Sequence, residues 1–162
     1  MDIALKWNTN LDWEGDLVLE HVDLLKDNGL STAILISLYT DRRANTSDRL
    51  PDSSSIDKRG WWGDLLDPPV VDDRIGSRLW LLEREQDIIR VLSLAKIYAE
   101  EALHWLVEDG IASSVKVTAT EGVPMEDKTI NAHRLAFQLE IIKATGEVLT
   151  YSAEWEAQLS GI

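Results

Sequence analysis

Residues 87–110 read DIIRVLSLAKIYAEEALHWLVEDG, and this stretch decides the fold class. Its apolar residues recur at steps of three and four positions, which is the spacing of one face of a helix. Polar residues such as Arg90 and Glu100 lie on the opposite face. Gly110 ends the pattern, because glycine readily adopts the backbone conformation that closes a helix. The sequence therefore predicts a helix from Asp87 to Glu108, with one face packed against the protein and the other exposed to solvent.

After this helix the apolar period changes to two, which is typical of half-buried strands. Three such alternations follow one another, and residues 144–147 provide the turn between the last two. Because a sheet with one apolar face must bury that face, we expect the long helix to cover it. The predicted class is α+β, with a long helix packed on a small antiparallel sheet of about three C-terminal strands. The residues expected on the buried face are Val115, Val117, Ala119, Leu135, Phe137, Leu139, Ile141, Leu149, Tyr151, Ala153 and Trp155.

The region before the helix is less regular, and we expect it to be a long ordered N-terminal and loop region. Residues 31–40 favour a short helix, because Ser31 and Thr32 can cap one, although the isoleucines and leucines there also suit a buried strand. From Arg43 to Asp73, prolines, serines and aspartates disfavour periodic structure. We expect a single domain over residues 1–162, made of an N-terminal extension (1–30), a helix and Trp-rich loop region (31–86), and a helix with an antiparallel sheet (87–162).

The composition limits the kinds of partner. The chain has 162 residues, of which 44% are hydrophobic, enough for one core of ordinary size. Acidic residues number 29 against 16 basic ones, a formal charge of -13, and no basic cluster could neutralise a row of phosphates. We therefore expect no direct binding to nucleic acid. The excess of acid is typical of a soluble, self-repelling surface, and it also fits steering toward basic partners.

Compartment signals are few. The chain has no cysteine, so it can hold neither a disulfide nor a thiolate metal ligand, and this fits synthesis in the cytoplasm. Its first residues lack a basic start followed by an apolar run, so we expect no signal peptide. Apolar runs such as Leu79–Leu82 fall far short of the roughly 20 residues that cross a bilayer, so we expect no membrane partner.

The chain offers few groups for catalysis or metal binding. Histidine occurs at positions 21, 104 and 133, and no two of these have a helical i,i+4 spacing; His104 is expected at the surface. No Gly-x-Ser-x-Gly elbow and no glycine-rich phosphate loop is present. We therefore expect no catalytic residue, no cofactor and no metal. One alternative stays open, since glycoside hydrolysis needs only two carboxylates and the chain offers Asp41, Asp64, Asp72, Asp73, Glu83 and Glu85.

The long loop contains the motif Gly60-Trp61-Trp62-Gly63-Asp64, and long loops inside compact domains usually have a function. Tryptophan suits a site where an apolar ring also meets a polar partner, so the two indoles are either core residues or interface anchors. The sequence leaves both possibilities open, whereas Trp105 and Trp155 are expected in the core. Arginines of this region can form bidentate pairs with carboxylates, and pairing within the chain is favoured over pairing with another chain. They are Arg42, Arg43, Arg59, Arg74 and Arg78.

Several blocks of the sequence occur in an order typical of one family. They are residues 36–44 (ISLYTDRRA), 59–64 (RGWWGD), 76–82 (GSRLWLL), 98–106 (YAEEALHWL) and 108–112 (EDGIA). In these blocks the chain resembles the Mu-type gene-46-like tail protein family, over most of its length. That family is similar to the gene-25-like sheath initiators of contractile tails, α+β proteins of the baseplate wedge that template the first ring of sheath. Where the sheath initiators have a Glu-Pro-Arg motif after the long helix, this chain reads Glu108-Asp109-Gly110, which keeps the acid and lacks the proline and arginine.

The resemblance implies a non-enzymatic structural subunit of a contractile phage tail baseplate, present in multiple copies in the virion and made in the host cytoplasm. Its implied partners are other baseplate wedge subunits, the central hub or spike protein and the tail sheath protein. The sheath initiators also carry a lysozyme label, so a peptidoglycan-degrading hydrolase is the alternative. We expect an open edge of the C-terminal sheet, over residues 147–155, to pair with strands from sheath arms. The residues expected to take part in interactions are Asp41, Arg42, Arg43, Gly60, Trp61, Trp62, Gly63, Asp64, Arg78, Trp80 and Glu108.

Overall fold

A computed structural model describes residues 30–65, 74–85, 87–122 and 133–157, together with short strands between residues 2 and 27. The chain divides into two compact units, Met1–Ile36 and Ser37–Ile162. The expectation of a single domain over residues 1–162 stays a prediction. In the first unit, antiparallel ladders pair β1 (Asp2–Ile3) with β6 (Lys26–Asp27), β2 (Leu5–Trp7) with β3 (Gly15–Leu17), and β4 (Leu19–Glu20) with β5 (Asp23–Leu24).

Helix α1 runs over Ser31–Tyr39, which confirms the helical reading of this segment over the strand reading. Its side chains Ile34 and Leu38 are buried. The last turn is held by polar contacts as well, because the Trp105 indole N–H donates to Ser37 Oγ at 3.1 Å. This contact joins two residues of the second unit.

Helix α2 (Ile88–Ala102) begins where the sequence predicts a helix. The Asp87 carboxylate caps it by accepting from the N–H groups of Ile89 and Arg90, which are otherwise without helical partners. Its buried stripe repeats every three or four residues, as the apolar pattern predicts. The stripe consists of Val91, Ala95, Ala99 and Ala102.

The predicted single helix over Asp87–Glu108 is wrong at its end, because α2 stops at Ala102 and a separate helix, α3, covers Trp105–Glu108. Between them the backbone tightens: His104 N–H donates to Glu101 O and Leu106 N–H donates to Leu103 O, both three residues back. Leu103 and Leu106 are both 0% exposed. Both leucines are fully buried at this tighter turn. The apolar periodicity of the sequence does not reveal the turn.

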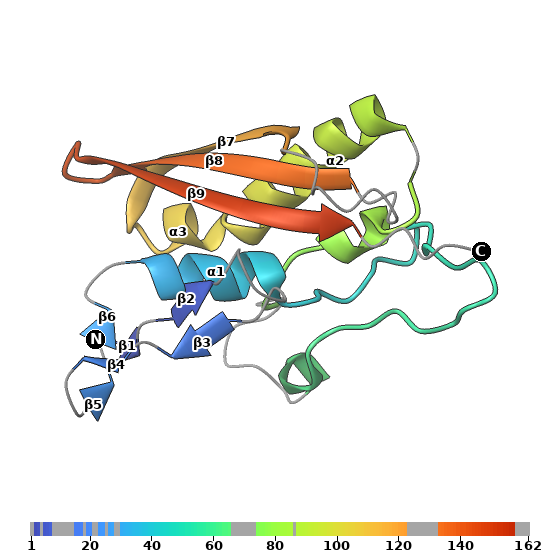
Figure 1. The fold of residues 1–162 in the computed structure, drawn as a ribbon, viewed down its shortest axis with the longest axis horizontal. Helices are drawn as coiled ribbons and strands as arrows, with labels where there is room; N and C mark the ends of the chain where they lie inside the picture. The colour runs from blue at the N-terminus through green and yellow to red at the C-terminus, as the bar shows by residue number, and fades with distance from the viewer. Residues whose placement is uncertain are drawn as a thin grey trace. The chain divides into compact units, whose positions relative to one another are not determined.

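The C-terminal sheet is a three-stranded antiparallel meander in the order β7 (Ala112–Glu121), β8 (His133–Lys143) and β9 (Val148–Ala157). Figure 1 shows the strands lying side by side in this order. In one row, Val117 pairs with Leu139, which pairs with Tyr151, so the predicted buried residues share a face. Helices α2 and α3 pack against β7. The α+β prediction, with a helix on an antiparallel sheet, is confirmed.

In the described residues 40–65 and 74–85, the loop between α1 and α2 is mostly without regular structure. Its two short 3-10 helices are η1 (Trp62–Leu65) and η2 (Leu79–Leu82). All four residues of η2 are buried, so this apolar run belongs to the core. In Figure 1 the loop's cyan and green segment runs outside the sheet.

A parallel bridge between Asp41 and Ser77 pins the base of this loop. Arg42 N–H donates to Ser77 O at 2.8 Å, and Ser77 N–H donates to Thr40 O at 2.8 Å. The Ser77 hydroxyl adds a bond to Leu38 O at 2.5 Å. Gly76 precedes the bridge with φ +96°, where a Cβ would overlap the Thr40 carbonyl. Only glycine fits this position.

Gly76→Ala is therefore expected to lower the free energy of unfolding by roughly 2–4 kcal/mol, measured by urea denaturation, because it combines a clash with backbone strain. The matched control is Gly110→Ala, which also has a positive φ, +70°, but has nothing within 4 Å of its new Cβ. Strain alone should lower its stability by about 1 kcal/mol. Equal losses in the two variants would show that the bridge does not depend on close approach at Gly76.

Candidate interaction surface

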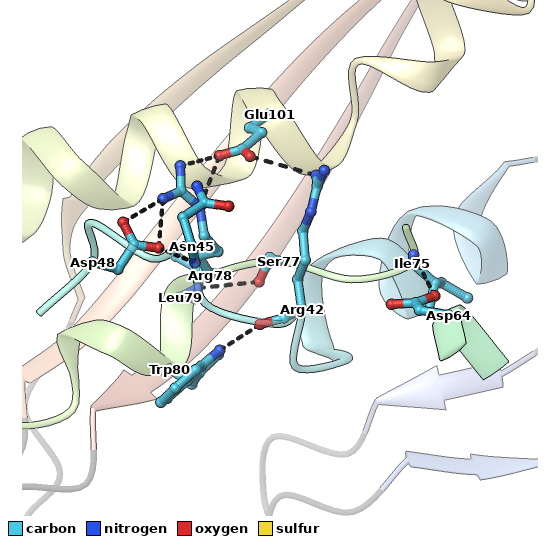
Figure 2. Close-up of polar contacts among 10 residues, drawn as sticks. All are labelled: Arg42, Asn45, Asp48, Asp64, Ile75, Ser77, Arg78, Leu79, Trp80 and Glu101. Carbon is cyan, nitrogen blue, oxygen red and sulfur yellow. Dashed lines mark hydrogen bonds and ion pairs between the residues drawn. The ribbon is translucent and has the colours of Figure 1, made fainter. Parts of the chain in front are cut away.

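Arg78 sits between two carboxylates that come from distant parts of the chain (Figure 2). Its Nη1 lies 2.8 Å from Asp48 Oδ1 in the loop, and its Nη2 lies 2.5 Å from Glu101 Oε2 on α2. The guanidinium also lies over the Tyr98 ring, 4.6 Å from its centroid. Only 13% of the Arg78 side chain and 12% of the Asp48 side chain are exposed, so this pair is largely shielded from solvent.

Arg42 connects this cluster to the hydrophobic core. Its Nη1 lies 3.5 Å from Glu101 Oε1, and its carbonyl accepts the Trp80 indole N–H at 2.8 Å, as Figure 2 shows. Trp80 is 4% exposed and packs with Ala44 and Leu81. The predicted interaction residue Trp80 is thus buried within the chain, with its polar N–H satisfied.

Arg59 forms a second cluster. Its guanidinium binds Glu83 through two bonds, 2.8 and 2.9 Å, and Asp41 at 2.9 Å, while its Cζ lies 4.6 Å from the centre of the Trp80 ring. Burial raises the pKa of Asp41, and the neighbouring Arg59 charge opposes this effect. Arg59 has φ 49°, which is unusual for a residue with a side chain. This backbone conformation sits directly before the tryptophan motif.

The expectation that arginines pair within the chain is confirmed for Arg42, Arg59 and Arg78. Their partners Asp48 and Glu101 were not among the residues singled out by the sequence, because separations of 30 and 23 residues leave no local signal. Together the clusters tie the loop, η2 and α2 into one unit. They therefore hold the loop through charge-assisted hydrogen bonds rather than through a large apolar contact.

Trp61 and Trp62, here called the tryptophan pair, are exposed. Their exposed fractions are 43% and 67%, and their ring centroids lie 5.4 Å apart. The Trp61 ring lies so close to Gly63 that a Cβ there would overlap it. Gly60, with φ +108°, turns the chain against Arg43, whose Cβ would be 2.7 Å from an added Cβ. The glycines of the motif thus permit the position of the Trp61 indole.

Asp64 completes the motif within η1. Its Oδ1 accepts from Ile75 N–H at 3.4 Å, whereas its buried Oδ2 has no hydrogen-bond partner among the residues that the structure describes. Glu108, the last residue of α3, lies 3.6 Å from the His104 ring, and both side chains are exposed. His104 is exposed, as predicted. Asp72 and Asp73 lie outside the described residues.

The β9 edge presents backbone groups away from the sheet. Lys143 N–H donates to Glu147 O at the β8–β9 turn, so these two residues form a hydrogen-bonded pair. Because bonded and non-bonded pairs alternate along an antiparallel ladder, the backbone groups of every second β9 residue point outward. In the register of β8 and β9, these residues are Val148, Thr150, Ser152, Glu154 and Glu156.

The opposite edge of the sheet differs. Val117 N–H points outward from β7 and donates to Glu100 Oε1 on α2 at 3.4 Å. Since α2 also packs against β7, a helix side chain already meets this edge. The β7 edge is therefore covered by α2 at Val117 in the described part of the sheet.

Metal-binding and membrane-spanning features were not found among the described residues. In these ranges no three His, Cys, Asp or Glu side chains gather closely enough to hold a metal ion. No helix in the same ranges is long and apolar enough to cross a bilayer.

Residues 30–148 match the model of a family described as Phage protein GP46. The chain belongs to the phage protein GP46 family. Among its relatives, it is 39% identical over 161 residues to the "Baseplate protein gp46" of Escherichia phage Mu, covering 99% of each chain. It is also 42% identical over 119 residues to the "Mu-like prophage FluMu protein gp46" of Haemophilus influenzae, covering 74% of this chain and 76% of that protein.

The GP46 family match contains both arginine clusters, the tryptophan pair and the beginning of β9. The resemblance inferred from the ordered sequence blocks is thereby confirmed. The interaction roles of the eleven residues named from the sequence stay predictions, although the structure brings Asp41, Arg42, Arg78 and Trp80 into one connected network.

Replacing Arg78 by leucine should lower the free energy of unfolding by roughly 3 kcal/mol, because the shielded Asp48 carboxylate would lose its counterion and Glu101 would keep only the longer pair with Arg42. The matched control is Arg84→Leu, since the Arg84–Asp52 pair spans 3.8 Å and both side chains are nearly half exposed. That variant should lose no more than about 1 kcal/mol. Urea denaturation followed by tryptophan fluorescence measures both, and a small loss for Arg78→Leu would contradict the bridging role.

Proposed function

We propose that the chain is a non-enzymatic structural subunit of a contractile phage tail baseplate, acting by assembly with other proteins. The observation that carries this proposal is the 39% identity with a protein named as a baseplate protein, over 99% of both chains. Relatives at this identity over their whole length share a fold and, in general, the surfaces that fold presents. The proposed location is the tail baseplate of the virion, after synthesis in the host cytoplasm.

The arrangement of carboxylates supports assembly over the alternative of peptidoglycan hydrolysis. A glycosidase needs one carboxyl group that can release a proton and a second that can act on the sugar. Asp41 and Glu83, two of the candidates, share the guanidinium of Arg59 and are hydrogen bonded to it. A shared counterion of this kind is typical of a structural contact, because the guanidinium occupies carboxylate oxygens that would otherwise act on a substrate.

Two surfaces support contacts with neighbouring subunits. The tryptophan pair offers exposed, positioned aromatic rings, and aromatic anchors of this kind dominate the energetics of many interfaces. The β9 edge offers outward backbone groups to an extended segment of another chain. We propose wedge subunits, the central hub or spike protein and the tail sheath protein as partners, with sheath arms as the source of the extended segment and several copies of the chain per particle.

A comparison of purified tails with the isolated chain tests the function. We expect the chain in the baseplate end of intact tails, detected by labelled antibody in electron micrographs. We also expect that the isolated chain clears no peptidoglycan suspension, with hen lysozyme as the positive control for the substrate. Clearing by the chain, abolished by Asp41→Asn or Glu83→Gln, would favour the hydrolase instead.

Trp62→Ala should weaken incorporation into tails by roughly thirtyfold, the equivalent of an anchor worth about 2 kcal/mol. It should leave the isolated chain's stability nearly unchanged, because 67% of the Trp62 side chain is already exposed. Ile97→Ala is a matched control, an exposed apolar residue on α2 at 52%. The measurement is competition between variant and unmodified chain for places in assembling tails. Normal incorporation of Trp62→Ala would remove the tryptophan pair from the interface.

A further inference from the structure

The Tyr39 hydroxyl donates a hydrogen bond to the backbone carbonyl of Glu154. Tyr39 is the last residue of α1, whereas Glu154 lies near the end of β9, so the contact joins residues 115 positions apart. Glu154 is one of the β9 residues whose backbone points away from β8. The tyrosine therefore occupies the outer edge of the sheet at this one position.

The position of the phenol excludes a further strand there. A neighbouring strand would place its backbone about 4.8 Å from β9, in the same plane as the outward carbonyls. A hydroxyl within hydrogen-bond distance of the Glu154 carbonyl lies in that same space. A tyrosine hydroxyl is protonated at neutral pH and can donate, and burial raises the pKa of the Tyr39 hydroxyl further.

Before this position the edge is open. Val148, Thr150 and Ser152 point their backbone groups outward, and all three side chains are exposed. Residues 148–153 include no charged side chain and no proline, so this stretch lacks the features by which proteins usually protect an edge strand. The open stretch is thus short, and the tyrosine contact marks its end.

We propose that Tyr39 is a register stop, which limits a docking strand to the part of β9 from Val148 to Ser152. The inference rests on the proposed function, since it takes the β9 edge as the place where an extended segment docks. It adds a specificity-determining residue to that edge: a segment that pairs with β9 must end, or turn away, before Glu154.

The occupant that fits this edge is an extended segment of a different protein, uncharged in its middle and basic at its flanks. The open stretch lies between Glu147 and Glu154, and the whole chain carries a charge of -13. Pairing two copies of β9 would bring these acidic ends together and add the repulsion of two acidic chains. A segment with basic flanks would meet the same ends favourably.

Hydrogen exchange on single amides of the isolated chain and of the chain in assembled tails tests the register stop. The outward amides of Val148, Thr150 and Ser152 should exchange at least about tenfold more slowly in tails, whereas the amide of Glu156 should not change. The inward amides of Leu149 and Tyr151 serve as internal controls, because β8 already bonds them in the isolated chain.

Two variants address the stop itself. Tyr39→Phe removes the hydroxyl and Tyr39→Ala removes the ring, and each should extend the tail-dependent protection beyond Ser152 to Glu156. Tyr151→Phe, the loss of a hydroxyl from β9 itself, is the matched control and should leave the unmodified pattern. If Tyr39→Ala does not fold, Tyr39→Phe carries the test alone, because it keeps the size of the ring.

The outcomes separate the two proposals. Protection that already reaches Glu156 in the unmodified chain would overturn the stop and leave strand docking standing. If the protected stretch of β9 ends at the same residue in folded Tyr39 variants, the stop is likewise overturned and strand docking stands. The absence of any tail-dependent protection along β9 would overturn strand docking, and the stop with it, while the identity of the chain as a tail subunit would still be decided by its presence in tails.

Discussion

The arrangement of the second unit depends on the two ion pairs that the Arg78 guanidinium forms. The guanidinium joins a loop carboxylate, Asp48, to a helix carboxylate, Glu101, with little access to water. A buried pair of this kind adds little net stability over a well-packed apolar group, but removal of one partner leaves a charge stranded. Its main effect is geometric, because the planar fork of arginine accepts few alternative arrangements. The loop consequently has one position relative to α2.

The second cluster extends this constraint toward the surface. Arg59 is held by two carboxylates and by the Trp80 ring, and the chain turns there through two positive φ angles, 49° at Arg59 itself and 108° at Gly60. The exposed indoles follow immediately. An aromatic anchor that is already positioned loses less conformational entropy on binding than one on a mobile loop. The internal ion pairs and the exposed tryptophans are thus parts of one arrangement, in which buried polar contacts position an apolar surface.

The sequence predicted those parts of the fold whose signal is local. Alternation at every second residue predicted the inward faces of β7, β8 and β9, of which that of β8 is fully buried and that of β9 partly buried, and spacing of three and four predicted α2. It missed the turn at Leu103 and His104, because the apolar pattern continues through it without interruption. It also missed the carboxylate partners of Arg78, since charged residues far apart in sequence carry no periodic signal. Burial of Trp80 followed from tertiary packing alone.

The bridge between Asp41 and Ser77 closes the ends of the intervening segment into a ring of backbone hydrogen bonds. For a flexible segment with fixed ends, doubling the length costs only about 0.6 kcal/mol of closure entropy. Insertions and deletions within this segment are therefore inexpensive only at positions that leave the closing residues and the ion pairs of Asp48 and Arg59 in place. Related chains can therefore differ in length within this segment while they keep the same helix and sheet.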